Sequence, residues 1–279
     1  MRMTSYTVQE RDGFRFVDHG PLTKRPAVVL LHGMLGALEN WTATIDGLTA
    51  AGHRVIAPNL PVYDLPLSET SVSGLVRYTV GLTMSLQLDQ PVLIGNSLGG
   101  QVALLYALEF RGEEKQPSAL ILTGASGVQE VVMGESTPRR FDRGYVKERA
   151  AYTFHDPRHA SDELVDGIME IVADRNRLIR LIKMARSSRD ETVEELLTNI
   201  PTPTLLIWGT EDRLTPPHIA RRFEDRLANA RLELIPACGH APMIEHPETF
   251  NRLVIDFLND LEEDSNDKAQ PDLRVSSNL

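Results

Sequence analysis

Pro91-Val-Leu-Ile-Gly95-Asn96-Ser97-Leu98-Gly99-Gly100 leads directly into the largely apolar segment 101–108. The first half of this stretch is apolar, as in a buried strand, and its end is typical of the start of a helix. A turn flanked by glycines lies between the two. Gly-x-Ser-x-Gly is the spacing of a nucleophile elbow, a sharp strand-to-helix turn that exposes its serine. Gly95 and Gly99 suit such a turn because they lack the Cβ atoms that would crowd it. The alternative is a glycine-rich turn with an incidental serine, so the surrounding sequence must decide.

The segments on either side of this stretch alternate between strands and helices. Arg11-Asp12-Gly13 is flanked by two short strand patterns, at 6–9 and 14–18, which indicates a hairpin. Further strands are expected over 27–31, 53–57, 118–123, 204–208 and 232–235, and helices over 40–51, 72–86, 218–227 and 247–261. Continuously apolar strands are typical of a sheet that is covered on both faces. The alternation therefore predicts an α/β fold with a parallel sheet.

Residues 128–200 break this alternation. They are almost wholly helical in pattern and rich in arginine. Ser161, followed by two acidic residues, has the signature of a helix N-cap. Two apolar stripes at helical spacing are expected to pack inward: Leu164, Val165, Ile168, Met169 and Val172 in one, and Leu178, Ile179, Leu181, Ile182 and Ala185 in the other. We interpret this segment as a helical cap inserted after the sixth strand.

The domain organisation follows from this insertion. Residues 1–127 are predicted to form the first part of an α/β core, 128–200 the cap and 201–262 the second part of the core. The remaining residues, 263–279, are expected to be an acidic, disordered tail. From Asp260 onward the chain has six acidic residues against two basic ones and few apolar side chains.

Composition and charge narrow the classes of function. Of the 279 residues, 42% are hydrophobic, as in a globular protein with a sizeable core. The formal net charge of -10 would be repelled by nucleic acid and by anionic membranes. We therefore expect a small-molecule substrate, no nucleic-acid partner and no stable membrane association, with the oligomeric state left open.

Localisation is predicted from what the sequence does not contain. The N-terminus has no apolar signal core, and no apolar run is long enough to cross a bilayer. Cys238 is the only cysteine, which suits a reducing compartment. We expect a cytoplasmic protein, in which Cys238 is packed rather than reactive.

Two residues beyond other strand ends are candidates to activate Ser97. A serine hydroxyl is a weak nucleophile, so it needs a base and an orienting acid within reach. In a parallel sheet these partners are expected just past strand ends, because the loops there share one edge. Asp212 follows the strand at 204–208, with Glu211 as the adjacent alternative, and His240 follows the strand at 232–235.

Several motifs resemble those of the α/β-hydrolase superfamily, over nearly the whole chain up to about Leu261. They are His32-Gly33 after the third strand, the turn 95–100, Trp208-Gly209 with Asp212, and Gly239-His240-Ala241-Pro242 leading to Glu245-His246-Pro247. The resemblance implies a mostly parallel eight-stranded sheet flanked by helices, with the cap after the sixth strand. It also implies that Ser97 is the nucleophile, His240 the general base, and Asp212, rather than Glu211, the carboxylate that orients His240.

The same resemblance assigns an oxyanion hole, which needs two backbone N–H groups that face the developing negative charge. Leu98, at the helix start after Ser97, supplies one of them. Met34, the residue after His32-Gly33, supplies the other, and His32 is expected to position this loop.

No cofactor and no metal site is expected. The spacing His155-Asp-Pro-Arg-His159 mimics a two-histidine helical metal motif, but Pro157 would disrupt the shared helical face. The glycines at 95–100 are followed by no Lys-Ser or Lys-Thr and do not match Gly-x-Gly-x-x-Gly. They therefore do not form a phosphate loop or a dinucleotide loop.

The chemistry expected of this site is hydrolysis of a small to medium carboxylic ester through an acyl-enzyme. Asn96 and the helical cap also resemble hydrolases that cleave carbon–carbon bonds in meta-cleavage products, where Asn96 would contact substrate and cap arginines would hold a carboxylate. Those enzymes usually have a bulky aromatic residue where this chain has Ala241, and a glycine-rich loop in place of 59–66. Carbon–carbon cleavage of a dienoate and a non-catalytic ligand-binding protein on the same fold are therefore the alternatives.

Overall fold

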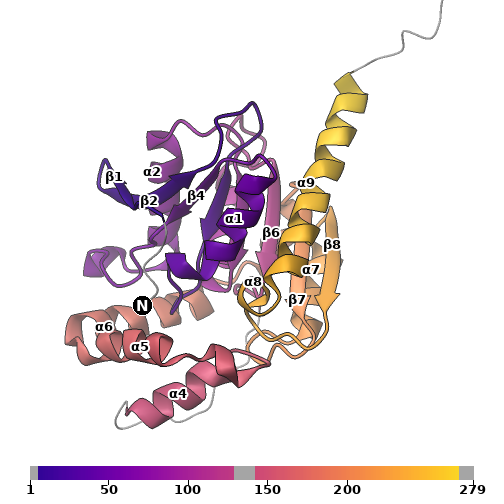
Figure 1. The fold of residues 1–279 in the computed structure, drawn as a ribbon. Helices are drawn as coiled ribbons and strands as arrows, with labels where there is room; N and C mark the ends of the chain where they lie inside the picture. Colours follow the sequence, from indigo (N-terminus) through magenta and orange to yellow (C-terminus); the bar gives the residue numbers. More distant parts are fainter. Residues whose placement is uncertain (1–5, 129–141, 270–279) are drawn as a thin grey trace, which may run out of the picture.

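An eight-stranded sheet forms the centre of the computed structural model, which describes residues 6–128 and 142–269 (Figure 1). The strands run in the order β1-β2-β4-β3-β5-β6-β7-β8. Their bounds are β1 Gln9–Arg11, β2 Phe14–His19, β3 Val28–Leu31, β4 Val55–Pro58, β5 Val92–Asn96, β6 Ala119–Thr123, β7 Thr204–Gly209 and β8 Ala230–Ile235. β2 pairs antiparallel with β1 and β4, and the remaining pairs are parallel. The strand that leads to Ser97, β5, lies between β3 and β6.

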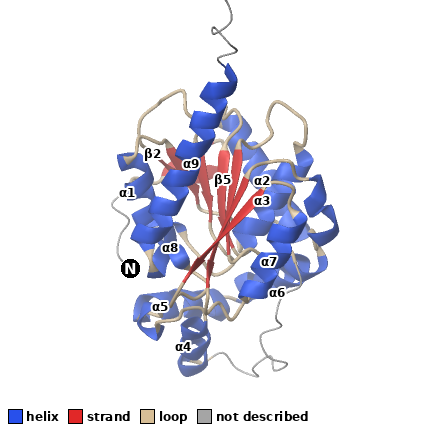
Figure 2. Ribbon diagram, turned by 90° about the vertical axis from the view of Figure 1, so that its right-hand side faces the viewer, coloured by secondary structure: helices blue, strands red, loops and turns tan. Residues whose placement is uncertain are grey.

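Helices cover both faces of the sheet because side chains alternate along each strand. In β3, Val29 and Leu31 join one apolar core, and Val28 and Leu30 join the other. The first core is completed by α2 Val72–Ser85, α3 Leu98–Glu109 and α7 Pro217–Arg226, and the second by α1 Thr42–Ala50, α8 Pro242–Glu245 and α9 Pro247–Ala269. Figure 2 shows these two groups of helices on opposite sides of the strands. The short 3-10 helices η1 Leu38–Trp41 and η2 Leu67–Glu69 precede α1 and α2.

The N-terminal hairpin turns where the sequence predicts. Asp12 and Gly13 have φ values of 51° and 82°, the left-handed conformation that a tight hairpin needs. Its first strand, β1, lies closer to the turn than the predicted strand at 6–9.

A helical cap lies between β6 and β7, below the sheet in Figure 1. Its described elements are α4 Arg143–Tyr152, η3 Pro157–His159, α5 Asp162–Ala173, α6 Arg175–Asp190 and η4 Glu194–Asn199. Ser161 caps α5 as predicted, since its hydroxyl accepts a hydrogen bond from the Leu164 N–H. Part of the segment predicted as the cap, residues 129–141, lies outside the described residues.

The buried face of α6 differs from the predicted apolar stripe. Met184 and Ser188 are buried, whereas Ile179 and Ile182 are 41% and 40% exposed. α6 meets the core partly through polar groups, because the Ser188 hydroxyl donates to the side-chain carbonyl of Gln101 in α3. Apolar spacing alone therefore does not identify the buried face of a helix whose contacts are polar.

The C-terminal helix is longer than the sequence predicts. α9 continues to Ala269, so residues 263–269, expected to be a disordered tail, are helical, while 270–279 lie outside the described residues. The packed turns near Phe250 and Leu258 nucleate the helix, and each further residue then extends it at little cost. Figure 1 shows this end of α9 projecting beyond the sheet. Neither α9 nor any other helix in the described part of the chain has the length and apolar character of a membrane span.

The turn between β5 and α3 is crowded by backbone atoms. A Cβ atom on Gly95 would lie 2.4 Å from the Gly99 carbonyl oxygen, and one on Gly99 would lie 2.1 Å from the Leu31 carbonyl oxygen. Ser97 has φ 53° and ψ -119°, a conformation that is strained for a residue with a side chain. The turn therefore has the geometry of the predicted elbow and not that of an ordinary glycine-rich loop.

Replacing Gly99 with alanine is expected to lower the free energy of unfolding by about 3 kcal/mol, because the new methyl group meets backbone that cannot rotate away. Gly167→Ala is the matched control, since nothing lies within 4 Å of a Cβ atom at this exposed position in α5. It is expected to stabilise the protein by about 0.5–1 kcal/mol. Urea unfolding of both variants measures the two effects, and equal midpoints would contradict the crowded elbow.

Candidate active site

Ser97 stands at the turn between β5 and α3, where it is partly exposed. Its backbone N–H donates to the Thr123 carbonyl at the end of β6 (3.0 Å). Its own carbonyl accepts the N–H groups of Gly100 (2.9 Å) and Ser126 (3.0 Å). These bonds hold the strained residue between β5 and the loop after β6.

Asp212 and His240 form a buried hydrogen-bonded pair. Asp212 follows β7, and its Oδ1 accepts the backbone N–H groups of Leu214 and Thr215, both at 2.9 Å. Its Oδ2 accepts the Thr215 hydroxyl at 2.8 Å and lies 2.9 Å from Nδ1 of His240. The sequence pointed to Asp212 but not to Thr215. The signal for Thr215 is weak, because a polar residue three positions after an aspartate also marks an ordinary turn.

The protonation state of Asp212 and His240 follows from the burial, charges and hydrogen bonds around them. Burial alone would raise the pKa of Asp212, but the neighbouring His240 and the hydrogen bonds from Thr215 outweigh it and hold that pKa below its ordinary value. An ionised carboxylate only accepts hydrogen bonds, so His240 carries its proton on Nδ1. Nε2 then has the lone pair that a general base needs.

Glu211, the alternative acid, has a different position. Its Oε2 accepts the Thr210 hydroxyl and the backbone N–H of Cys238, the latter at 3.0 Å. The carboxylate that accepts the hydrogen bond from the His240 ring is that of Asp212. Burial, reinforced by the charge of nearby Glu245, raises the pKa of the Cys238 thiol far above its usual range, which leaves Cys238 as a packed thiol.

Asn96 ties the loop that carries His240 to the sheet. The side chain is 5% exposed, and its Nδ2 donates to the carbonyls of Thr123 and His240, each at 3.1 Å. The imidazole of His240 also lies directly over Gly124, where a Cβ atom would be 2.6 Å from Nδ1. Asn96 therefore has a positioning role that the sequence did not predict, and its contact with substrate stays a prediction.

His32 organises the loop after β3. Its Nε2 lies 2.9 Å from the Leu60 N–H and so accepts that hydrogen bond, which leaves Nδ1 to donate to the Gly33 carbonyl at 2.8 Å. Burial lowers the pKa of His32 to about 4, against a smaller opposing effect of the bond to Gly33. The neutral ring thus joins the loops that follow β3 and β4.

The two residues predicted for the oxyanion hole come from two different segments of the chain. Leu98 is the first residue of α3, where a backbone N–H has no acceptor within its own helix. Met34 follows Gly33, and a Cβ atom on Gly33 would lie 3.2 Å from the Ser97 Cβ atom. The Tyr63 hydroxyl donates to the Met34 carbonyl.

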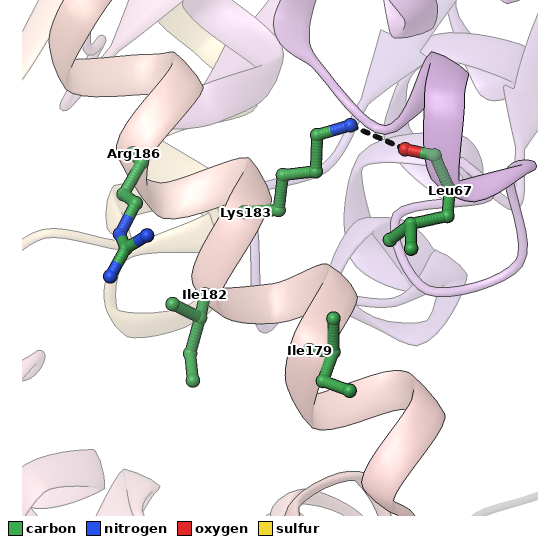
Figure 3. A pocket seen from close by; sticks show the side chains of 5 residues that line it. All are labelled: Leu67, Ile179, Ile182, Lys183 and Arg186. Carbon is green, nitrogen blue, oxygen red and sulfur yellow. Dashed lines mark hydrogen bonds between the residues drawn. The ribbon is translucent and has the colours of Figure 1, made fainter.

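Several of the described arginines of the cap pair with acidic residues at the surface. Arg143 pairs with Asp162 and Asp166, and Arg158 pairs with Asp156. A hollow of about 430 Å³ lies between α6 and η2, lined by Leu67, Ile179, Ile182, Lys183 and Arg186 (Figure 3). Lys183 points to the Leu67 carbonyl there and donates to it. Ser97, Asp212 and His240 do not line this hollow.

Metal ligands do not gather in the described part of the chain: no three His, Cys, Asp or Glu side chains form a group there that could hold an ion. His159 instead packs against the ring of Phe154, with 5.6 Å between ring centroids. Pro157 begins η3, and Asp156 caps it, so the two histidines of this segment do not share an α-helical face.

Comparison with known proteins agrees with this architecture. A model described as the alpha/beta hydrolase family matches residues 28–253. The chain belongs to the alpha/beta hydrolase family. A 2-hydroxy-6-oxo-6-phenylhexa-2,4-dienoate hydrolase of Burkholderia cepacia is 29% identical to it, over 83% of this chain and 87% of that enzyme.

Solved structures extend the comparison of this alpha/beta hydrolase. An alpha/beta hydrolase enzyme from a sediment metagenome of the Mar Chica lagoon, Morocco, is 31% identical, with a TM-score of 0.74 over 92% of this chain and 99% of that one. The esterase of Exiguobacterium antarcticum is 23% identical, with a TM-score of 0.71 over 92% and 100% of the two chains, and shows the common fold alone. The named relatives of this chain are thus hydrolases that have the same fold.

The buried neutral state of His32 makes stability depend on pH. Between pH 6.5 and 4 the unfolded chain binds a proton at His32 and the folded protein does not, so the free energy of unfolding falls as the pH falls. Relative to His32→Gln, the wild type is expected to lose about 2–3 kcal/mol between pH 7 and pH 4.5. Urea unfolding at several pH values measures this difference. His218 is exposed, so the His218→Gln variant serves as the control and is expected to follow the wild type. A difference in the free energy of unfolding between wild type and His32→Gln that stays constant with pH would contradict the buried neutral ring.

Proposed function

We propose that this alpha/beta hydrolase cleaves small to medium carboxylic esters through an acyl-enzyme formed on Ser97. The observation that carries the proposal is the buried Asp212, which is held ionised and oriented on Nδ1 of His240 at 2.9 Å. The strained elbow that presents Ser97 at the end of β5 supports it. The proposed reaction uses no cofactor and no metal.

In the first half of the reaction, Nε2 of His240 takes the proton from the Ser97 hydroxyl as Oγ attacks the ester carbonyl carbon. The tetrahedral intermediate collapses when the bond to the leaving alkoxide breaks, and His240 gives its proton to that alkoxide, which leaves as the alcohol. In the second half His240 takes a proton from water as the water oxygen attacks the acyl carbon. The bond between that carbon and Ser97 Oγ then breaks, the carboxylic acid leaves, and the proton returns to Ser97 Oγ. Asp212 stabilises the positive ring of His240 in both halves.

The oxyanion hole is proposed to consist of the backbone N–H groups of Leu98 and Met34. Leu98 supports this role because it begins α3, whose N-terminus favours negative charge. The approach of Gly33 to Ser97 supports Met34, since it brings the loop after β3 beside the nucleophile. His32 would keep that loop in place through its bond to the Gly33 carbonyl.

Carbon–carbon cleavage of a dienoate is the second candidate, because the Burkholderia cepacia relative is named for such a substrate. The same three residues would serve, with His240 again moving the protons. A non-catalytic ligand-binding protein on this fold is the alternative outside enzyme chemistry. Reaction of Ser97 with a fluorophosphonate separates an active nucleophile from this last alternative.

Ser97→Ala is expected to lower kcat for short-chain p-nitrophenyl esters by at least about 10⁴-fold, and Asp212→Asn by about 10³–10⁴-fold, because the latter leaves His240 without its ionised partner. Glu211→Gln is the matched control for the adjacent carboxylate and is expected to cost far less. Release of p-nitrophenol measures all three. Equal rates for Ser97→Ala and the wild type would exclude the acyl-enzyme. Turnover of a dienoate, followed by loss of its visible absorbance, without ester turnover would favour the carbon–carbon hydrolase.

A further inference from the structure

Glu245 joins the loop of His240 to the cap through its two carboxylate oxygens. Oε1 accepts the backbone N–H of Gly239 at 2.7 Å. Oε2 accepts the N–H groups of His155 at 2.7 Å and of Asp156 at 3.2 Å, in the cap segment between α4 and η3. We call this set of bonds the Glu245 bridge. None of its three donors is a side chain, so the residue types at 155, 156 and 239 leave no mark of it in the sequence.

The bridge lies next to the residue that the proposed function uses as a base. The backbone N–H of His240 donates to the carbonyl of Thr153, the C-cap residue of α4, at 2.8 Å. A Cβ atom on Gly239 would lie 2.6 Å from the His155 nitrogen and 2.7 Å from the Thr153 oxygen. Beside the Glu245 bridge, the cap segment and the loop of His240 therefore also touch backbone to backbone.

Apolar packing supports the same contact. Phe154, which lies between Thr153 and His155 in the chain, is 5% exposed. It belongs to the same apolar core as Cys238 and Ala241, which lie before and after His240. Phe154 of the cap segment and two residues of the loop 238–241 consequently belong to one apolar core. A displacement of the cap at this point would displace the backbone of His240.

We propose that Glu245 is a positioning residue, through which the cap holds His240 in register with Ser97. This inference rests on the proposed function, because it assumes that His240 is the base. A carboxylate suits the role because both of its oxygens accept hydrogen bonds, and bonds to an ionised acceptor are stronger than those to a neutral one. A glutamine of the same shape has one acceptor oxygen, so its NH₂ group would face either the Gly239 N–H or those of the cap.

The opposite end of the cap is held by a separate set of bonds, which makes the bridge testable by itself. Nε2 of Gln101, in α3, donates to the carbonyls of Ser188 (2.9 Å) and Glu191 (2.7 Å). Val193 donates to the Gly127 carbonyl at 2.8 Å. Loss of the Glu245 bridge is therefore expected to loosen the cap at the His240 side while this second attachment stays in place.

Glu245→Gln is expected to lower kcat for the ester substrate about 10- to 100-fold, because a shift of the base by a fraction of an ångström misaligns proton transfer. KM is expected to change by less than about threefold, since the Glu245 bridge holds backbone N–H groups of the loop and of the cap. Glu248→Gln removes the same charge three residues away on an exposed side chain and is the matched control. A variant with unchanged kcat and only a lower melting temperature would overturn the positioning role.

Native-state hydrogen exchange tests the bridge in the unaltered protein, whether or not the variant folds. The amides of Gly239, His155 and Asp156 are expected to exchange with one common free energy of opening, because they share one carboxylate. Exchange at His155 and Asp156 that is more than about tenfold faster than at Gly239 would show that the cap opens without the loop, and would overturn the proposal. This readout needs no substrate. If the wild type turns over no ester while the three amides open together, the proposed function fails and the bridge stands.

Discussion

The contact between the Gly99 and Leu31 backbones is the constraint on which the site depends. Because no side chain separates them, α3 begins directly against the end of β3. The loop after β3 then reaches Ser97, and the Cα atom of Gly33 packs beside it. The strained backbone of Ser97 lies within the same crowded turn. The elbow and the neighbouring loop are thus two results of one close approach.

Buried polar side chains extend this arrangement to the other loops at the same edge. His32 joins the loops after β3 and β4, and Asn96 joins the end of β5 to the loop of His240. Both are satisfied by backbone groups, which is the condition under which a buried polar group is tolerated. Asp212 is likewise saturated, by two backbone N–H groups and by Thr215 and His240. In the proposed reaction only one of these groups, Asp212, would stabilise charge, and the others would hold loops.

The cap is part of this network and not only a cover. It contacts the backbone of His240 directly through Thr153, and α3, the helix that follows Ser97, holds its far end through Gln101. Both partners of the proposed proton transfer are therefore attached to the same inserted segment. A relative with the same fold and a different inserted segment would hold the same three residues through different contacts. Such a difference in contacts is one way in which the fold could act on different substrates.

Much of this molecule could be predicted from local patterns. A strand can be recognised within about ten residues of sequence, because burial and turn chemistry act over that range. The same range of sequence places Ser97, Asp212 and His240 just past three strand ends. The buried face of α6 and the length of α9 could not be predicted in this way. The first depends on polar contacts with a distant helix, and the second on a nucleus that packing supplies.

What the sequence determined by itself is therefore the fold class and the order of the three residues proposed for catalysis. Only the tertiary structure decided how they are held. Asn96 donates a hydrogen bond to the loop of His240, and Glu245 joins Gly239 to a cap residue ninety positions away in the chain. The physical reason is that these bonds end on backbone N–H and carbonyl groups. Nearly every residue has both groups, so no residue type along the chain records which of them a distant side chain will meet.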